Sequence, residues 1–198
     1  MNTITGIQWY LSEMPLRNDI TKLFASQNAD DIFQTVIHEF ELKNKNFNLE
    51  EFNVGTLHGQ KVYAFDMRTV YGSQGKSFSF FTVGEKVGFA ATFQYRSEIR
   101  AWVEDEVYKS SSASCSLEDF YKFLLKTRGT PFNPKRIAGD NHSAGMEKSW
   151  KRFGGFSSEV WERVPNNTKY KLRKDLNFFS KGIWSDPPND YFVVIELK

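Results

Sequence analysis

A run of short aromatic and β-branched segments in the second and third quarters of the chain constrains the fold most. Residues 61–69, 77–83 and 86–95 read KVYAFDMRT, SFSFFTV and KVGFAATFQY, and glycine-containing polar stretches separate them. Segments of this composition, punctuated by turn residues, are typical of strands that pair with their sequence neighbours. Residues 98–108 (EIRAWVEDEVY) alternate between two faces and add a further strand. The pattern predicts successive antiparallel strands between residues 61 and 108.

Apolar residues at helical spacing predict an amphipathic helix on either side of these strands. Residues 30–43 (DDIFQTVIHEFELK) carry such a repeat behind a pair of aspartates, which suit the N-terminal end of a helix. Residues 117–128 (LEDFYKFLLKTR) carry another, with Ser116 as the expected N-cap and Gly129 as a stop. Both helices are expected to pack their apolar faces against the sheet.

The last third of the chain alternates short strands with one further helix. Residues 135–138, 159–164 and 191–197 have the composition of strands, and residues 143–153 that of a helix. A meander followed by these elements predicts the α+β class, with a mostly antiparallel central sheet flanked by helices.

Chain length favours one domain, because only longer chains must split to bury their apolar residues. The chain has 198 residues, 40% of them hydrophobic. We therefore expect residues 1–198 to form a single domain. Its parts are an N-terminal helical region (1–50), antiparallel strands (52–108) and a β-loop-α-β-α-β part (109–198).

Charge and cysteine content exclude some classes of protein. A formal net charge of +2 is too small for a whole-molecule field that attracts DNA or anionic lipid. Cys115 is the only cysteine, which excludes an internal disulfide and fits a reducing compartment. His38, His58 and His142 lie far apart in the sequence, so no metal site is expected. With no signal-like N-terminus and no long apolar run, we expect a cytoplasmic protein without a membrane segment.

The order of elements and one short motif carry a resemblance to a known family. Asn141 is followed three residues later by Ala144, then by an aromatic residue, Trp150, and by Gly155-Phe156. This segment follows an antiparallel meander and lies within a β-loop-α-β-α-β order of elements, and in both respects the chain resembles the GNAT acyltransferases. The segment is longer than is usual in that family, and it has Trp150 where the family commonly has tyrosine. The resemblance implies a GNAT-like fold that transfers an acyl group from acyl-CoA to an amine.

The resemblance assigns the acetyl-CoA site to the loop after residue 108. There the family exposes backbone N–H groups at a helix N-terminus, which hold the pyrophosphate. The family has glycines in this loop, and this chain has a lysine followed by small residues and no glycine. The cofactor-binding residues implied are Lys109, Ser110, Ser111, Ser112, Ala113, Ser114 and Asn141. The alternative is a solvated serine turn that caps a helix.

Acyl transfer to an amine needs a base for the attacking amine and a proton donor for the departing thiolate. Glu104 and Glu106 precede the loop and are the candidate catalytic bases, expected on one face of their strand by its period of two. Exposed strand-end carboxylates without a role are the alternative. The indole of Trp150 is not a practical proton source, and Tyr170, Tyr191 or a thiol remain open as substitutes.

Trp150 also has a structural interpretation. Met146, Trp150 and Phe153 recur at helical spacing and predict a stripe that is buried against the sheet, which makes Trp150 a core anchor. A small buried thiol is the corresponding expectation for Cys115.

Basic and aromatic residues are interleaved between residues 148 and 174, which suggests nucleic-acid contact or a solvated helix or loop face. Two functions therefore remain open. The first is acyl transfer from acetyl-CoA to a small-molecule or protein amine. The second is a non-catalytic binding or inhibitory protein of viral (for example phage) or mobile-element origin, which uses a GNAT-like scaffold to contact protein or nucleic acid.

Overall fold

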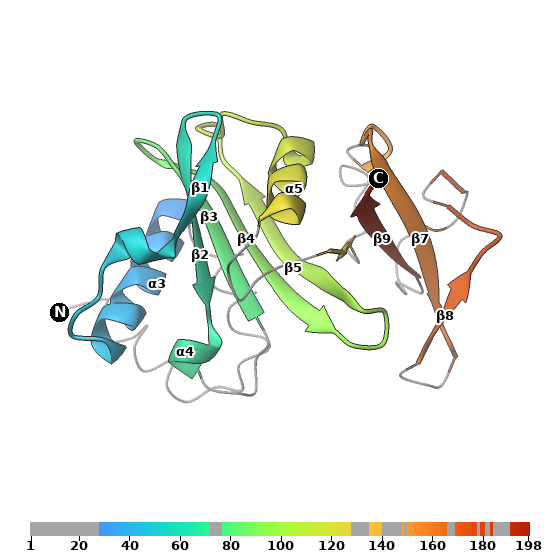
Figure 1. Ribbon diagram of the computed structural model, residues 1–198, viewed down its shortest axis with the longest axis horizontal. Helices are drawn as coiled ribbons and strands as arrows, with labels where there is room; N and C mark the ends of the chain where they lie inside the picture. The colour runs from blue at the N-terminus through green and yellow to red at the C-terminus, as the bar shows by residue number, and fades with distance from the viewer. Residues whose placement is uncertain are drawn as a thin grey trace.

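The described strands form one sheet with the order β1-β2-β3-β4-β5-β6-β9-β7-β8 (Figure 1). The computed structural model describes residues 28–71, 77–127, 135–139, 148, 150–165, 169–177, 179, 180, 183 and 191–198. The strands are β1 (Asn53–Leu57), β2 (Gln60–Asp66), β3 (Ser77–Val83), β4 (Val87–Arg96), β5 (Ala101–Lys109), β6 (Ile137–Gly139), β7 (Phe156–Arg163), β8 (Tyr170–Arg173) and β9 (Tyr191–Leu197). Together with its few helices, this large, mostly antiparallel open sheet makes a single α+β domain.

The meander predicted between residues 61 and 108 is confirmed. Strands β1 to β4 each pair antiparallel with the next strand in sequence. Aromatic side chains fill much of this part of the sheet, as in the T-shaped contact of Phe80 with Phe93. Short runs of this composition form neighbouring strands because each buries its side chains against the next.

Strands β5 and β6 are parallel, whereas the strands before them are antiparallel. In this parallel pair Trp102 is opposite Ile137 and Glu104 is opposite Gly139. Every other neighbouring pair among the described strands is antiparallel. Parallel neighbours need a crossover connection, and the helix α5 (Leu117–Lys126) lies in it. Figure 1 shows β6 as a short bridge between β5 and β9.

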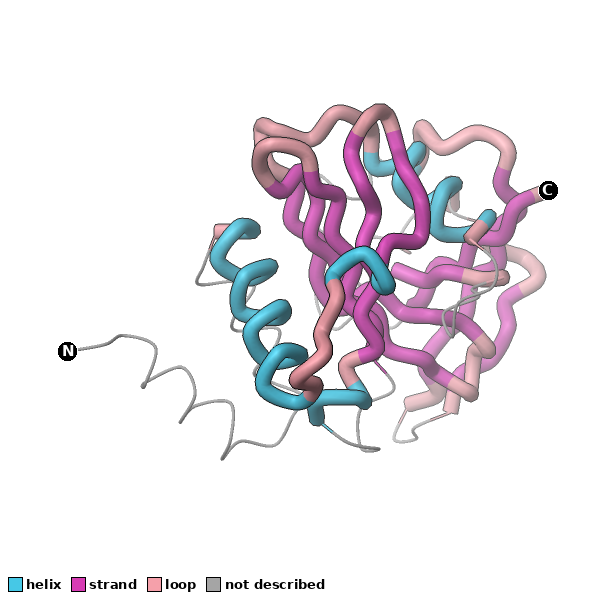
Figure 2. Tube along the Cα trace, turned by 60° about the vertical axis from the view of Figure 1, so that its left-hand side comes forward, coloured by secondary structure: helices cyan, strands magenta, loops and turns pink. Residues whose placement is uncertain are grey.

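The helices cover the two faces of the sheet. Helix α3 (Ala29–Lys43) begins after the N-cap Asn28 and buries Phe33 and Phe40 against Phe65 of β2. The short helices η1 (Leu49–Phe52) and α4 (Arg68–Tyr71) follow it in the chain. Helix α5 packs on the opposite face from α3 (Figure 2), where Phe120 stacks on Phe89. We call these faces the α3 face and the α5 face.

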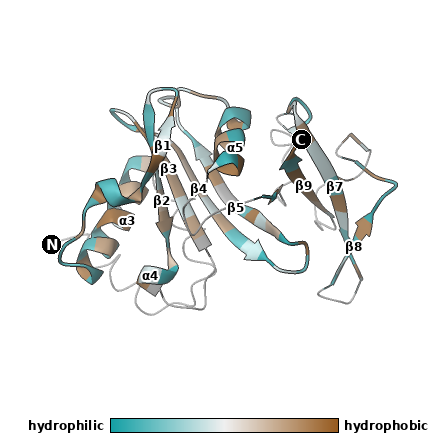
Figure 3. Ribbon diagram, in the orientation of Figure 1, coloured by the Kyte–Doolittle hydropathy of each residue, from teal (hydrophilic) through white to brown (hydrophobic). Residues whose placement is uncertain are grey.

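Hydrophobic residues concentrate in the strands, whereas the connecting ends of the hairpins are more hydrophilic (Figure 3). On the α5 face the core runs from Phe80 and Phe93 across Ile137 to Val193 and Val160. Trp150 and Phe153 belong to this core, and Trp150 is fully buried. The expected core role of Trp150 is therefore confirmed, while Met146 lies outside the described residues.

Some of the expected elements lie partly or wholly outside the described residues, and one expectation is corrected. Lys148 and Trp150 are helical, and the other residues of the predicted helix up to Trp150 lie outside the described part. Gly129 and residues 1–27 also lie outside it. The expected solvated helix or loop around residues 170–173 is wrong, because they form the edge strand β8 paired with β7. None of the described helices is long and apolar enough to cross a membrane.

Candidate functional site

The candidate site lies where β5 ends and α5 begins. Residues 110–116 connect the two elements, so the loop of the sequence analysis is positioned at a helix N-terminus. In sheets with parallel strands, ligands bind beyond the carboxyl ends of those strands. The loop at the end of β5 has this position.

Helix α5 begins with a capping box between Ser116 and Asp119. Ser116 Oγ accepts a hydrogen bond from the Asp119 amide (3.1 Å), and Asp119 Oδ2 accepts one from the Ser116 amide (3.3 Å). The hydrogen bond from the Ser116 hydroxyl lowers the pKa of Asp119, and the nearby His58 and Lys122 lower it further. The predicted N-cap is confirmed, and the carboxylate places a negative charge at this helix end.

The loop itself is closed by internal hydrogen bonds. Ser110 donates from its amide to Gly88 O (2.9 Å) and from its hydroxyl to Val87 O (2.6 Å). The Ser112 amide donates to Ser110 Oγ (3.1 Å), and the Ala113 amide donates to Ser110 O (3.3 Å). These amides, expected to face a pyrophosphate, have partners within the chain.

Gln60 at the start of β2 anchors the other half of the loop. Its Nε2 donates to Ser112 O (3.0 Å), and its Oε1 accepts from the amide (3.3 Å) and hydroxyl (3.1 Å) of Ser114. Thr82 Oγ1 donates to the same Oε1 (3.2 Å). Gln60 is almost completely buried. Sequence reasoning missed this residue, because its partners in the loop lie more than 50 residues away in the chain.

Gly88 allows this arrangement because it leaves room for the glutamine. A Cβ atom at this position would lie 2.5 Å from Gln60 Oε1 and 2.9 Å from Ala113 Cα. Real side chains do not approach so closely, so the loop and β4 can meet only at a glycine.

Two further predicted residues of this region are accounted for. Lys109 Nζ lies 5.5 Å from the ring centroid of Phe89, where a cation and an aromatic face attract each other. Cys115 is buried, and burial raises the pKa of its thiol to about 11. The expected small buried thiol is confirmed, and at neutral pH it is protonated.

The two candidate bases do not share a face of β5. Thr92 is paired with Glu106 and Phe93 with Glu104, so the register shifts at this point. Thr92 and Phe93 are consecutive residues of β4, so they belong to opposite faces of the sheet. Their partners on β5, Glu106 and Glu104, therefore occupy register positions on opposite faces as well. The expectation from the period of two is wrong because a β-bulge at residue 105 inserts an extra residue.

Glu104 lies on the α5 face and is 2% exposed. Its cross-strand neighbours are Phe93 on β4 and Gly139 on β6. The ring of Trp150 covers Gly139, since a Cβ atom there would lie 2.9 Å from Trp150 Cζ2. The carboxyl group of Glu104 thus lies in an aromatic environment. It belongs to the last pair, Glu104 with Gly139, in the register of the parallel strands β5 and β6.

Tyr121 of α5 lies over the same place. Its ring contacts Phe93 (centroids 6.4 Å apart) and Trp150 (5.7 Å apart), which flank the position of Glu104 on either side. The Tyr121 hydroxyl is buried, and within the described structure it has no hydrogen-bond partner. Sequence reasoning counted Tyr121 among the apolar residues of its helix and so missed the hydroxyl.

The other candidate proton donors lie elsewhere. Tyr191 Oη donates to Glu162 Oε1 (3.3 Å). Tyr170 packs against Phe192 (centroids 4.9 Å apart), in the apolar cluster on the α3 face.

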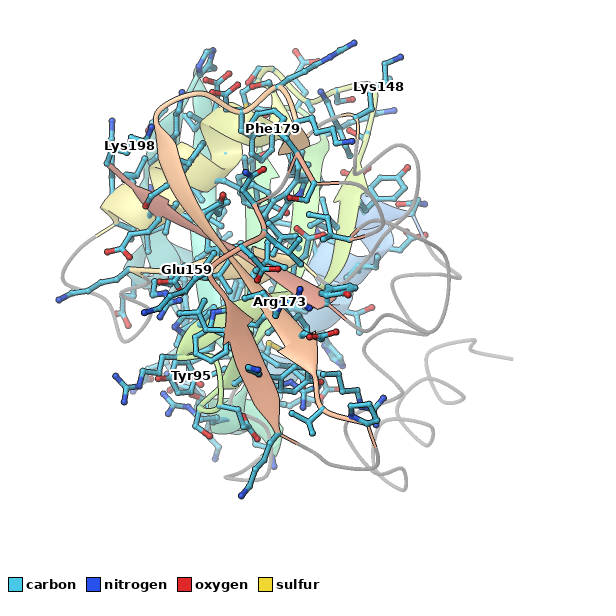
Figure 4. The ribbon with its side chains drawn as sticks, turned by 90° about the vertical axis from the view of Figure 1, so that its right-hand side faces the viewer. Tyr95, Lys148, Glu159, Arg173, Phe179 and Lys198 are labelled. Atoms are coloured by element: carbon cyan, nitrogen blue, oxygen red, sulfur yellow. The ribbon has the colours of Figure 1, made fainter. Side chains whose placement is uncertain are left out.

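The basic region partly neutralises its own charge. Arg173 of β8 forms ion pairs with Glu162 (2.7 Å) and Asp175 (2.6 Å), and Arg136 pairs with Glu159 of β7. Figure 4 shows Arg173 and Glu159 on these outer strands. The contact with Arg173 lowers the pKa of Asp175 to about 2. Within residues 148–174, Arg173 is thus tied to carboxylates of the chain.

The structure places Glu104 between Phe93, which Tyr121 contacts, and Gly139, which Trp150 covers, and it places residues 110–114 before the N-terminus of α5. It does not bring Glu106 to the same face as Glu104. Asn141, Ala144 and His142 lie outside the described residues. No family model, curated protein or solved structure matches the chain.

Proposed function

We propose that this chain is a divergent GNAT-like acyltransferase, which moves an acyl group from acyl-CoA to a small-molecule or protein amine. The observation that carries the proposal is the parallel pair β5 and β6, connected through α5, at the end of an antiparallel meander. This is the order of elements on which the resemblance rests. The buried Glu104 lies on β5, and the loop 110–116 follows the end of that strand.

The chemistry assigned to the site follows from these positions. Thioester aminolysis needs an anchor for the anionic cofactor and a base for the amine. The α5 N-terminus and Lys109 supply positive potential at the end of β5, although Asp119 offsets part of it. Glu104 is the base on the α5 face. Glu106 keeps its proposed role as an alternative base.

Acetyl-CoA binding tests the proposal directly. A ligand held at one site and present at about 100-fold its Kd stabilises a protein by about 2.7 kcal/mol. We expect calorimetric heat and a raised melting temperature with acetyl-CoA. Absence of both at millimolar acetyl-CoA would contradict the proposed function.

A matched pair of variants then tests the loop. Ser112 is exposed, and its backbone groups form the bonds to Ser110 and Gln60. Ser112→Asp adds a negative charge close to the proposed phosphate site and is expected to abolish binding. Ser112→Asn has similar size without the charge and is expected to retain most of the affinity. Equal affinity of the two variants would place the pyrophosphate elsewhere.

A second candidate is a non-catalytic binding or inhibitory protein of viral or mobile-element origin. It is favoured by the hydrogen bonds that already occupy the amides of Ser110, Ser112, Ala113 and Ser114. On this proposal the contact to protein or nucleic acid is made by the 148–174 region. Salt-dependent binding of a DNA or RNA oligonucleotide, without any effect of acetyl-CoA on the melting temperature, would select this candidate.

A further inference from the structure

We infer that β8 is a docking edge for an acidic, extended peptide, which joins the sheet as one more strand. Strand addition of this kind uses main-chain hydrogen bonds for affinity and alternate side chains for specificity. The inference goes beyond the proposed acyl transfer and does not depend on it, because β8 lies at the outer end of the sheet (Figure 1), away from the loop 110–116.

The first observation is that the two outermost strands of the sheet differ. Strand β1 has a bulge between Asn53 and Gly55, and a Cβ atom at Gly55 would lie 3.0 Å from Phe123 Cζ of α5. Bulges and covering helices protect an edge from pairing with another chain. Strand β8 keeps an unbroken register with β7, and no described strand lies on its other side.

The second observation is the direction of the main-chain groups of β8. In an antiparallel pair, hydrogen-bonded positions alternate with positions that are not bonded to the partner strand. The Val164 amide donates to Lys169 O (2.9 Å), so the bonded positions are Lys169 and every second residue after it. The N–H and C=O groups of Tyr170 and Leu172 therefore point away from β7, where an added strand would bond them.

The third observation is the charge of this edge. Residues 163–174 (RVPNNTKYKLRK) include five basic residues and no acidic one. Arg173 is balanced by Glu162 and Asp175, whereas Lys171 is exposed and forms no ion pair with another described residue. A lysine on an edge strand opposes pairing with a second copy of the same basic strand, and it favours a strand that carries carboxylates.

The side chains of β8 define the pattern of the partner. Lys171 is paired with Glu162 on the α5 face, whereas Tyr170 and Leu172 belong to the α3 face. A fitting peptide therefore alternates acidic with apolar residues. A nucleic acid fits less well, because it has no main-chain groups at strand spacing. The ring of Tyr170 is also packed against Phe192 (centroids 4.9 Å apart), so it is not available for stacking on a base.

The test uses the full chain and a synthetic octapeptide, acetyl-EVEVEVEV-amide, as the probe. We expect binding by calorimetry, together with slower hydrogen exchange at the amides of Tyr170 and Leu172. The amides of Lys171 and Arg173, which occupy positions bonded to β7, should change little. The same peptide with every main-chain nitrogen methylated keeps its charges but donates no main-chain hydrogen bond, and we expect it not to bind.

Two matched pairs of variants locate the contact. Leu172→Pro removes an N–H that faces outward, a substitution that an edge strand tolerates, and Leu172→Ala removes the side chain but keeps that N–H. We expect the proline variant to bind the peptide about 5-fold more weakly than the alanine variant. Lys171→Glu should weaken binding about 10-fold, whereas Lys45→Glu, the same charge change at an exposed site after α3, should leave it unchanged.

The remaining outcomes overturn the inference. Absence of peptide binding at millimolar concentration does so, and equal binding of the methylated peptide would reduce the contact to charge attraction. Binding of a single-stranded oligothymidylate instead of the peptide, with loss of that binding in Lys171→Glu, would assign the edge to nucleic acid. Dimers in sedimentation experiments, with slow exchange at Tyr170 and Leu172 before any peptide is added, would assign it to a second copy. If Leu172→Pro does not fold, Lys171→Glu and the methylated peptide still decide between these results.

Discussion

Two polar regions meet at α5 and differ in how their hydrogen bonds are satisfied. In the loop 110–116, main-chain and hydroxyl groups are bonded to Gln60, Gly88 and one another. On the sheet face below α5, the buried Tyr121 hydroxyl lacks a partner among the described residues. Buried polar groups in native proteins are normally paired. The hydrogen bonds of the loop are thus explained by folding, whereas the buried Tyr121 hydroxyl destabilises the fold by lacking one.

The largest expected effect comes from the ring that covers this face. Trp150→Ala should lower the free energy of unfolding by about 3–5 kcal/mol, because it leaves a large cavity over Gly139. Urea denaturation measures the change. Arg152→Ala is the control, since this exposed side chain is expected to change the stability by less than about 0.5 kcal/mol. A Trp150 variant that unfolds like the parent chain would show that the face is not held by this ring.

The next effect tests the loop side of the comparison. Gln60→Ala should lower the free energy of unfolding by about 1–3 kcal/mol, because it leaves Ser112 O and the Ser114 amide without their partner. Hydrogen exchange at the Ser114 amide should accelerate at the same time. Gln94→Ala on β4 removes an amide side chain of the same size, and we expect it to leave exchange at Ser114 unchanged. Unchanged exchange at Ser114 in Gln60→Ala would show that the loop holds its shape without the anchor.

A smaller effect concerns the cap of α5. Ser116→Ala should lower the free energy of unfolding by about 1 kcal/mol at neutral pH. Ser116 lowers the pKa of Asp119 in the folded state. The resulting stabilisation is present above the unfolded carboxyl pKa of about 3.9 and is lost as the pH falls through the lower folded value. The difference between parent and variant should therefore shrink below about pH 4. If the difference in unfolding free energy between the parent chain and Ser116→Ala instead grew below about pH 4, the assigned link between Ser116 and the Asp119 pKa would be contradicted.

The smallest expected effect has the opposite sign. Tyr121→Phe removes a buried donor that has no partner, so the free energy of unfolding should stay the same or rise by up to about 1 kcal/mol. Thermal and urea denaturation both measure it. A loss of more than about 1 kcal/mol would mean that the hydroxyl is satisfied in solution, and the contrast between the two regions would disappear.

Local patterns were sufficient for most of the fold. The strands between residues 61 and 108 follow from short aromatic runs and turn residues, and α3 and α5 follow from apolar spacing and caps. These features depend on neighbours in sequence, which one sequence displays. The edge strand β8 was missed because Tyr170 and Leu172 alternate with basic residues over four residues only, and so many basic side chains also suit a solvated face.

The site was less predictable, because its features are tertiary. The bulge at residue 105 reverses the face of one glutamate relative to the other, and no residue type marks it in the sequence. Gln60 acts through partners in a distant loop. Tyr121 has the same helical spacing as an apolar residue, and only burial shows that its hydroxyl lacks a partner.

The central claim is that the functional site lies on the α5 face, where β5 and β6 run side by side. A ¹H–¹⁵N titration of the full chain with acetyl-CoA tests it most directly. The account predicts that the amide signals of Glu104, Tyr121 and Gly139 shift together with those of residues 110–116 as the ligand saturates. Shifts confined to residues 148–174, or no shifts at all, would contradict it.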